Sequence, residues 1–424
     1  MKSNPAGLLL LAWTSCCWLV AIVAEAGTNW AFHAELSLKE AFDSNVYLQD
    51  HEPDRVAVPE AVSPFQESFV TIIAPKLELA WKPGTDFATK VSYAPEAAFY
   101  HAESSEDYVA HRGQLNLSGN TAGVPWDFVN ALTYVDGSDE GLFFGAPGGA
   151  PAIGGIPIRE RRDQLMYRGK LKATLTRGKW FLRPVFSAYV HDFQTLQRNC
   201  TNNPAYENYV DRSEIVVGAD LGCEVAARTR VFVGYRYGKE IQGKLVGSPF
   251  HYDATYHRPL AGIEGQPAEW LRLTVSMGPD VHQTTGNPAP GFNRNYTTLW
   301  ADAVVTISFS ATDELALSWR QNTQPAFASC SVYDDITYDA LFTHRFDKRR
   351  SASGGFRAYG GEWMAPVRRD DWIYTVSTRV VYAHDTHWSG EMGYSYDWAE
   401  SRVPNTSGRE FTRHIGFLGV RYSF

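Results

Sequence analysis

Apolar and polar residues alternate along segments of about ten residues, and turn-forming residues separate one segment from the next. Successive side chains of a β-strand point to opposite faces, so each segment predicts a strand with one apolar and one polar face. In the segment 164–175, the apolar face has Leu165, Tyr167, Leu171, Ala173 and Leu175, and the polar face has Arg168, Lys170, Lys172 and Thr174. The segments 214–225 and 298–309 repeat the pattern. Such segments are typical of transmembrane β-barrels.

Short and long links alternate between the segments, as they do in membrane barrels with short periplasmic turns and longer external loops. The short links are 82–86, 119–123, 177–179, 227–229, 265–269, 311–314, 347–352 and 385–387. The long links lie near 49–67, 101–108, 137–163, 194–211, 239–250, 279–294, 321–332, 364–371 and 400–410. The sequence therefore predicts an all-β fold: one antiparallel up-and-down barrel of about eighteen strands (roughly 16 to 18), with both termini in the periplasm.

Composition favours a membrane barrel over a soluble all-β fold. Aromatic residues make up 14% of the 424-residue chain, which suits a barrel with an aromatic girdle at each interface. A propeller would repeat a motif at the length of one blade, and no motif recurs. A sandwich would have shorter strands and less regular hairpins. Three prolines within predicted strands are expected to mark strand ends, bulges or misplaced boundaries, because proline lacks the ladder donor: Pro95, Pro184 and Pro259.

The N-terminus is typical of a secretory signal peptide. Lys2 provides a positive charge, residues 7–23 are apolar, and Ala24-Glu25-Ala26 gives the small-x-small cleavage pattern. We predict a signal peptide over 1–26 and a barrel over 27–424; the alternative is an uncleaved anchor, since the apolar stretch approaches spanning length. No long apolar run follows Gly27, which excludes a helical membrane protein. The mature chain keeps three cysteines, expected to be unpaired thiols, with a 200–223 bridge as the alternative: Cys200, Cys223 and Cys330.

The last six residues, 419–424, form an alternating strand that ends in an aromatic residue. The terminus has the pattern Gly-x-x-aromatic-x-aromatic, carried by Gly419, Tyr422 and Phe424. It resembles the closing-strand signal of bacterial outer-membrane β-barrels, although Phe417 stands where those proteins usually have a polar residue. The resemblance implies that the barrel-assembly machinery recognises the protein through this strand.

The exit of the first predicted strand, 30–43, has the pattern aromatic-Asp-x-Asn-hydrophobic-aromatic, carried by Phe42, Asp43, Asn45, Val46 and Tyr47. A second strand follows over 69–81. This opening resembles that of a loosely defined family of outer-membrane β-barrel porins, some of which are encoded beside exopolysaccharide genes. The resemblance implies a pore or an export channel in the outer membrane, with outer-membrane lipid as the surroundings.

No group of residues indicates catalysis or a cofactor. The acidic run 136–140 resembles a calcium loop but lacks the EF-hand spacing, so a solvated loop is favoured. His384 and His387 offer nitrogen ligands, but they fall in a predicted tight turn. The Gly-rich segment 145–155 lacks the Gly-Lys-Ser/Thr ending of a phosphate loop, and we interpret it as an external loop, with 137–163 as a candidate constriction of the pore. No enzyme, metal or cofactor is predicted.

The polar strand faces carry charges of both signs and are predicted to line the lumen: Arg112, Gln114, Arg168, Lys170, Lys172, Glu214, Asp220, Glu224, Arg236, Arg272, Asp302, Arg320, Arg379 and Arg421. A mixed-charge lumen orients polar solutes, and the same residues can also brace the wall as ion pairs. The net charge of −8 gives no basic excess for nucleic acid. The leading hypothesis is passive diffusion of small hydrophilic solutes; the alternatives are polysaccharide export and a structural or surface-binding barrel with a closed lumen.

Overall fold

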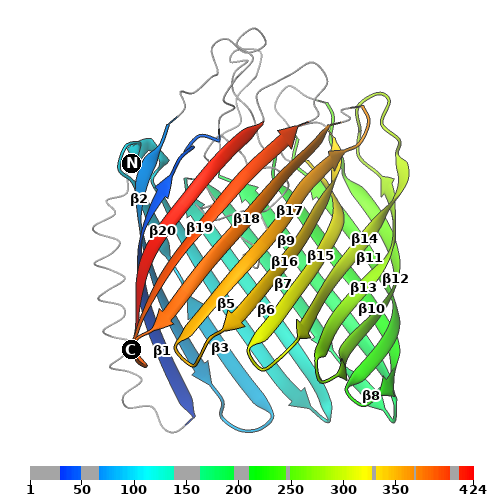
Figure 1. Ribbon diagram of the computed structural model, residues 1–424. Helices are drawn as coiled ribbons and strands as arrows, with labels where there is room; N and C mark the ends of the chain where they lie inside the picture. Colours follow the sequence, from blue (N-terminus) through cyan, green and yellow to red (C-terminus); the bar gives the residue numbers. More distant parts are fainter. Residues whose placement is uncertain are drawn as a thin grey trace.

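The computed structural model describes residues 29–48, 66–137, 163–194, 210–244, 249–326, 331–366, 369–401 and 410–424. Nearly all of these residues lie in tilted antiparallel β-strands that close into one barrel (Figure 1). A short 3-10 helix, η1(Ser104–Glu106), lies between two strands. Within these ranges no helix is long and apolar enough to cross a membrane.

The strands of the first half have these bounds: β1(Trp30–Asp43), β2(Ser68–Trp81), β3(Phe87–Tyr93), β4(Glu96–Tyr100), β5(Tyr108–Thr121), β6(Val124–Asp136), β7(Gln164–Ala173), β8(Leu175–Arg177), β9(Trp180–Phe193) and β10(Arg212–Ala226). Those of the second half are β11(Thr229–Gln242), β12(Ala254–Ala268), β13(Leu271–Thr284), β14(Asn295–Ser308), β15(Asp313–Pro325), β16(Val332–Arg345), β17(Arg350–Trp363), β18(Asp370–Ala383), β19(Trp388–Ser401) and β20(Phe411–Ser423).

Two of the barrel's strands are interrupted. Both β3 and β4 pair with β2 and β5, and both β7 and β8 pair with β9. The twenty segments of the described residues therefore form eighteen strands, each beside its neighbour in the sequence. The barrel closes where β1 pairs with β20, from Glu35↔Ser423 to Asp43↔Ile415. The predicted antiparallel barrel of about eighteen strands is confirmed.

Most predicted boundaries hold to within a few residues, and one predicted turn is wrong. The first strand, 30–43, coincides with β1. The predicted short link 265–269 belongs mostly to β12, and the turn follows at 269–270. Gly265 has φ +131°, a conformation that favours glycine, and the register between β12 and β13 shifts between Gly265 and Ala268. The glycine therefore marks a β-bulge and not a turn.

The strand prolines interrupt the hydrogen-bond ladder in different ways. Pro95 lies in the break between β3 and β4, as expected for a proline at a strand end. Pro184 lies inside β9, opposite Ala219. Pro259 lies inside β12, and the ladder with β13 is interrupted there, where Pro279 occupies the facing position. Neither proline has a backbone N–H to donate. Because the two prolines face each other, they interrupt the hydrogen-bond ladder at one place instead of two.

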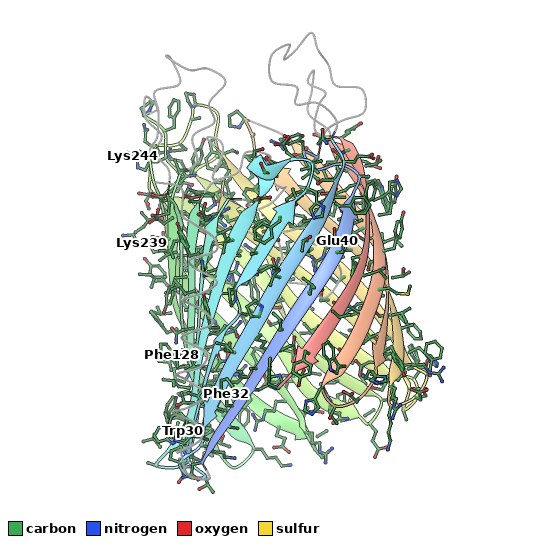
Figure 2. All side chains as sticks on the ribbon, turned by 90° about the vertical axis from the view of Figure 1, so that its left-hand side faces the viewer. Trp30, Phe32, Glu40, Phe128, Lys239 and Lys244 are labelled. Carbon is green, nitrogen blue, oxygen red and sulfur yellow. The ribbon has the colours of Figure 1, made fainter. Side chains whose placement is uncertain are left out.

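The two faces of the barrel differ in polarity. Large apolar side chains stay exposed at alternating positions of many strands, among them Leu38, Val217, Val233, Leu299, Val376 and Leu418. Exposed aromatic side chains gather at the end with the short turns: Trp30, Trp180, Trp270, Phe309, Phe346, Trp388 and Phe424. Figure 2 shows Trp30 and Phe32 near this end and Lys239 and Lys244 toward the other. Exposed apolar residues at a period of two identify the outer face of the barrel.

Candidate functional site: the inner face of the barrel

Contacts that skip strands identify the inner face. Arg183 on β9 donates from Nη1 to Glu264 on β12, at 2.8 Å from Oε2, across β10 and β11. Arg212 on β10 donates to the carbonyl of Pro325 at the end of β15, at 3.3 Å. Side chains converge on the concave side of a closed sheet and diverge on its convex side. The face that carries Arg183 and Arg212 is therefore the interior.

The strand registers place all fourteen predicted lumen residues on this inner face. Six of them take part in five ion pairs on the inner face, which are Arg112–Glu96, Lys172–Asp127, Asp220–Arg236, Arg379–Glu391 and Arg421–Glu35. Arg168 lies over the ring of Tyr189. Glu214, Asp302 and Arg320 meet at one cavity, described below. That the fourteen line a water-filled path stays a prediction.

A charged network braces the wall across four strands. Asp220 is 1% exposed, accepts a hydrogen bond from Arg183 at 2.9 Å and forms an ion pair with Arg236 at 2.7 Å. Arg183 then reaches Glu264, and its guanidinium lies over the rings of Phe181 and Phe232. Because each charge has a partner and the arginine is covered by aromatic rings, this network is structural, as the wall-bracing interpretation predicts.

The aromatic-Asp-x-Asn segment after β1 turns into the barrel. Asp43 accepts from Arg413 of β20 at 2.9 and 2.7 Å, and both side chains are buried. Asn45 donates from its side chain to the carbonyl of Thr412 at 2.9 Å. The sequence motif is therefore the anchor that ties the start of the first loop to the last strand.

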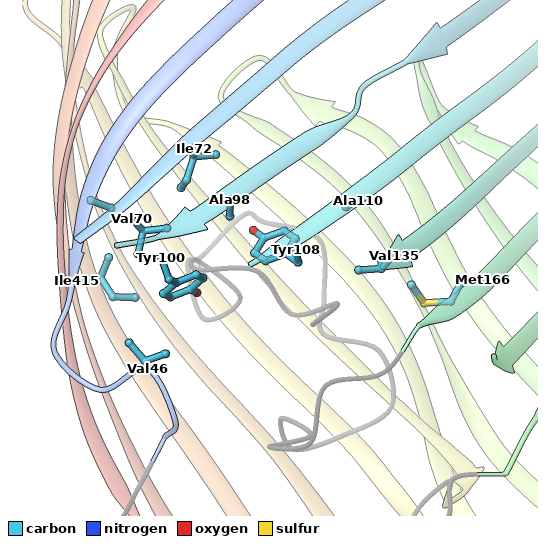
Figure 3. Close-up of a cluster of buried hydrophobic side chains, with 11 residues drawn as sticks. Val46, Val70, Ile72, Ala98, Tyr100, Tyr108, Ala110, Val135, Met166 and Ile415 are labelled. Atoms are coloured by element: carbon cyan, nitrogen blue, oxygen red, sulfur yellow. The ribbon is translucent and has the colours of Figure 1, made fainter. Parts of the chain in front are cut away.

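Two apolar clusters on the inner face receive this segment. Val46 packs with a cluster that includes Val70, Tyr100, Tyr108 and Ile415, as Figure 3 shows. Leu48 packs with a second cluster of inner-face residues: Tyr359, Ile373, Ala399 and Phe411. Phe417, the departure from the closing-strand pattern, also points inward and packs against the first cluster. One side of the interior is therefore apolar. The inward segment 44–48 covers this side and narrows the interior of the barrel.

On the other side, the end of β15 crosses toward β10 and β11. Besides the Arg212 contact, the side chain of Gln242 on β11 donates to the carbonyl of Ala326 at 2.5 Å. Between this crossing and the wall lies a cavity of about 180 Å³. Its lining includes Tyr189, Arg212, Glu214, Glu240, Trp300 and Arg320. Glu214 and Arg320 are among the predicted lumen residues; Arg212 and Glu240 are not, although the same alternation places them on the inner face.

A larger groove, of about 520 Å³, lies on the outer face between β18, β19, β20, β1 and β2. Its lining is mostly apolar and includes Leu38, Val380, Met392, Leu418 and Val420. An apolar groove on the convex face of the barrel suits a hydrocarbon chain and not a hydrophilic solute.

A hydroxyl, an imidazole and a carboxylate meet on the outer face, but they are not arranged as a nucleophile relay. Thr71 Oγ1 lies 2.7 Å from Glu40 Oε2 and 2.8 Å from His101 Nε2. The same ring nitrogen lies 3.6 Å from Glu40 Oε1. A relay needs one nitrogen on the nucleophile and the other on the carboxylate, so this geometry supports no acyl transfer.

Several predictions concern residues that the structure does not describe. The signal peptide 1–26, the segment 145–155, most of the candidate constriction 137–163, and Cys200 and Cys330 lie outside the described ranges. Residues 138–140 of the acidic run lie outside them too. In the turn 384–387, the side chain of Asp385 accepts from the backbone of His387 and Trp388, each at 2.7 Å, as in an ordinary turn.

Comparisons with known proteins give remote similarities of fold. No protein-family model and no curated protein matches the chain. Among solved structures, the outer membrane protein OpdK from Pseudomonas aeruginosa is 9% identical, with a TM-score of 0.44 over 93% of this chain and 99% of its own. OccAB4 from Acinetobacter baumannii is 12% identical, with a TM-score of 0.43 over 94% and 99%.

The ferric citrate transporter FecA, in its unliganded form, is 11% identical, with a TM-score of 0.45 over 93% of this chain. The chain spans 64% of the length of FecA. Because these identities and TM-scores are low, the function of the protein is inferred from its own residues.

Proposed function

We propose that the protein is an outer-membrane channel through which small hydrophilic solutes diffuse passively. The observation that carries the proposal is the opposite polarity of the two faces: the outer face exposes residues such as Val233 and Leu418, and the inner face carries the charged residues named above. Lipid requires an apolar surface with every backbone group paired, which a closed barrel provides. At eighteen strands, side chains do not fill the interior, so water enters.

The ends of the barrel support an orientation. Short turns and exposed aromatic residues, among them Phe424, gather at the same end of the barrel. In outer-membrane barrels the short turns face the periplasm, and aromatic residues mark the interface. Both termini of the barrel would then lie on the periplasmic side, after export with the predicted signal peptide.

Polysaccharide export is the second candidate, and the inner aromatic rings weigh against it. Sugar chains move along exposed aromatic faces, but four aromatic rings of the inner face lie under arginine side chains. Arg183 covers Phe181 and Phe232, and Arg258 lies over Tyr256 and Trp300. The family resemblance of the segment 42–47 favours export; its observed role, as an anchor to β20, is structural.

Conductance of the purified, folded protein in a planar bilayer tests the proposal. We expect discrete openings in potassium chloride and uptake of small sugars into proteoliposomes. A folded barrel that never opens would favour the closed-lumen alternative. Openings combined with sugar-oligomer permeation faster than monomer permeation would favour export.

A further inference from the structure

The cavity beneath the end of β15 brings together charges that lack partners. Glu214 on β10 and Glu240 on β11 face each other directly in the strand register, on the inner face. Like charges in facing positions destabilise a sheet unless something compensates them. Within the described residues, neither carboxylate has a Lys, Arg or His nitrogen within ion-pair distance; Glu214 accepts from the hydroxyl of Tyr256 at 2.5 Å.

The lack of a partner is more costly for Glu240, because this side chain is almost fully buried. Its side chain is 5% exposed, and its Oε2 is buried without a hydrogen-bond partner. Arg258 of the neighbouring strand β12 also lines the cavity, but it is paired with Asp280 at 2.6 Å. Burying a carboxylate without a partner is costly, so this position favours a ligand that supplies a donor or a positive charge.

The same cavity holds an arginine without a carboxylate. Arg212 is 7% exposed and donates to the carbonyl of Pro325 and the hydroxyl of Tyr189, both at 3.3 Å, while its Nε is buried without a partner. No carboxylate of the described residues lies within ion-pair distance of it, and Arg212 and Glu240 both line the cavity. The pocket therefore offers an acceptor for a cation and a donor for an anion at separate points.

From this geometry we propose that the cavity is a binding site for a small zwitterion that carries an ammonium group and a carboxylate. The ammonium lies against Glu240 and Glu214, and the carboxylate lies against Arg212. The volume of about 180 Å³ holds roughly six water molecules, which matches a solute of five to eight heavy atoms. The proposal rests on the proposed channel, and it names the class of solute that the channel selects.

The test measures binding separately from transport. Ligand-observed NMR on the detergent-folded protein compares 4-aminobutyrate with butylamine and butyrate, which present one charge each. We expect 4-aminobutyrate to bind more tightly than either single-charge analogue, and Glu240→Gln to weaken it at least about tenfold, as expected for the loss of a hydrogen bond to a charged group.

A matched control is available on the same strand and the same face. Glu224 lies ten residues after Glu214 on β10, roughly 33 Å along the strand, and is exposed outside the cavity. We expect Glu224→Gln to leave the affinity within twofold and Glu214→Gln to weaken it. Arg212→Gln should weaken 4-aminobutyrate and butyrate but not butylamine. If that variant does not fold, the comparison of the three ligands on the unchanged protein decides.

Binding of butylamine as tight as that of 4-aminobutyrate would overturn the zwitterion in favour of a simple cation site, and binding of none of the three would overturn the site. In both cases bilayer conductance can still be normal, so the channel would stand. A protein that binds 4-aminobutyrate but never opens would overturn the channel and leave the site.

Discussion

Asp43 and Arg413, which are 370 residues apart in the chain, form a two-point ion pair inside the barrel at its seam. Asp43 is the last residue of the first strand, and Arg413 lies near the start of the last strand. Both side chains are buried, and the pair sits beside the inward segment 44–48. The ion pair therefore joins closure of the barrel to the position of the first loop.

We expect Asp43→Asn to destabilise the barrel by about 3–5 kcal/mol, because it breaks a buried, two-point ion pair with Arg413. The measurement is equilibrium urea unfolding in detergent micelles or lipid vesicles. Asp127→Asn is the control, since Asp127 pairs with Lys172 where both side chains are exposed and ion pairs contribute little. Equal losses in the two variants would show that the seam ion pair has no special weight.

The alternation of residues was sufficient to predict the fold and the face of each charge. All fourteen predicted residues lie on the inner face because a period of two fixes the side of every strand residue once one is known. The predicted turn at Gly265 failed because glycine permits a bulge as readily as a turn.

The cavity beneath the end of β15 was less predictable from the sequence than the inner face of the strands. Arg212 and Glu240 follow the same alternation, but the cavity between them forms because the end of β15 crosses to β10 and β11. That crossing depends on long-range contacts at Pro325 and Ala326, which no local pattern announces. The motif at Asp43 and Asn45 was recognised, but its partner, Arg413, is set by closure.

The orientation of the barrel can be tested with a matched pair of cysteines. Lys244, in a long link, and Lys348, in a short turn, are both exposed. In a background with Cys200, Cys223 and Cys330 replaced by serine, a membrane-impermeant maleimide should label Lys244→Cys on intact cells and leave Lys348→Cys unlabelled until the cells are lysed. The reverse pattern would place the short turns outside.

The terminal aromatic residue can be separated from an ordinary girdle residue. Phe424 and Phe309 are both exposed aromatic residues at the short-turn end, at 68% and 63%. If Phe424 belongs to an assembly signal, Phe424→Ala should lower the yield of heat-resistant folded barrel in the membrane several-fold more than Phe309→Ala. Similar yields would reduce Phe424 to an interface anchor.

The turn between β18 and β19 should lose stability at low pH. The backbone N–H groups of Trp388 and His387 donate to Asp385 and hold the pKa of its carboxyl below the ordinary value. A lowered folded-state pKa stabilises the fold above the unfolded-state pKa, and that stabilisation is lost as the pH falls through the folded-state pKa.

We therefore expect Asp385→Asn to lower the urea midpoint at pH 7 and to have a smaller effect as the pH falls below the ordinary aspartate pKa of about 3.9 toward the folded-state pKa. Asp86→Asn, in the exposed turn between β2 and β3, controls for the change of charge. A deficit for Asp385→Asn that is unchanged at low pH would mean that its cause is not the ionised carboxylate.

Glu240→Gln should stabilise the empty protein even though it weakens binding. The substitution keeps the shape of the side chain, removes the repulsion with Glu214, and gives an amide that can donate to that carboxylate. Because a buried charge without a partner is costly, we expect a gain of about 1–3 kcal/mol in the free energy of unfolding without ligand. Glu224→Gln should change stability little, since Glu224 is exposed. Excess 4-aminobutyrate should shrink the gain, because it stabilises the wild type more than the variant, which binds it more weakly. A destabilised Glu240→Gln barrel would mean that Glu240 already has the partner that the zwitterion is proposed to supply.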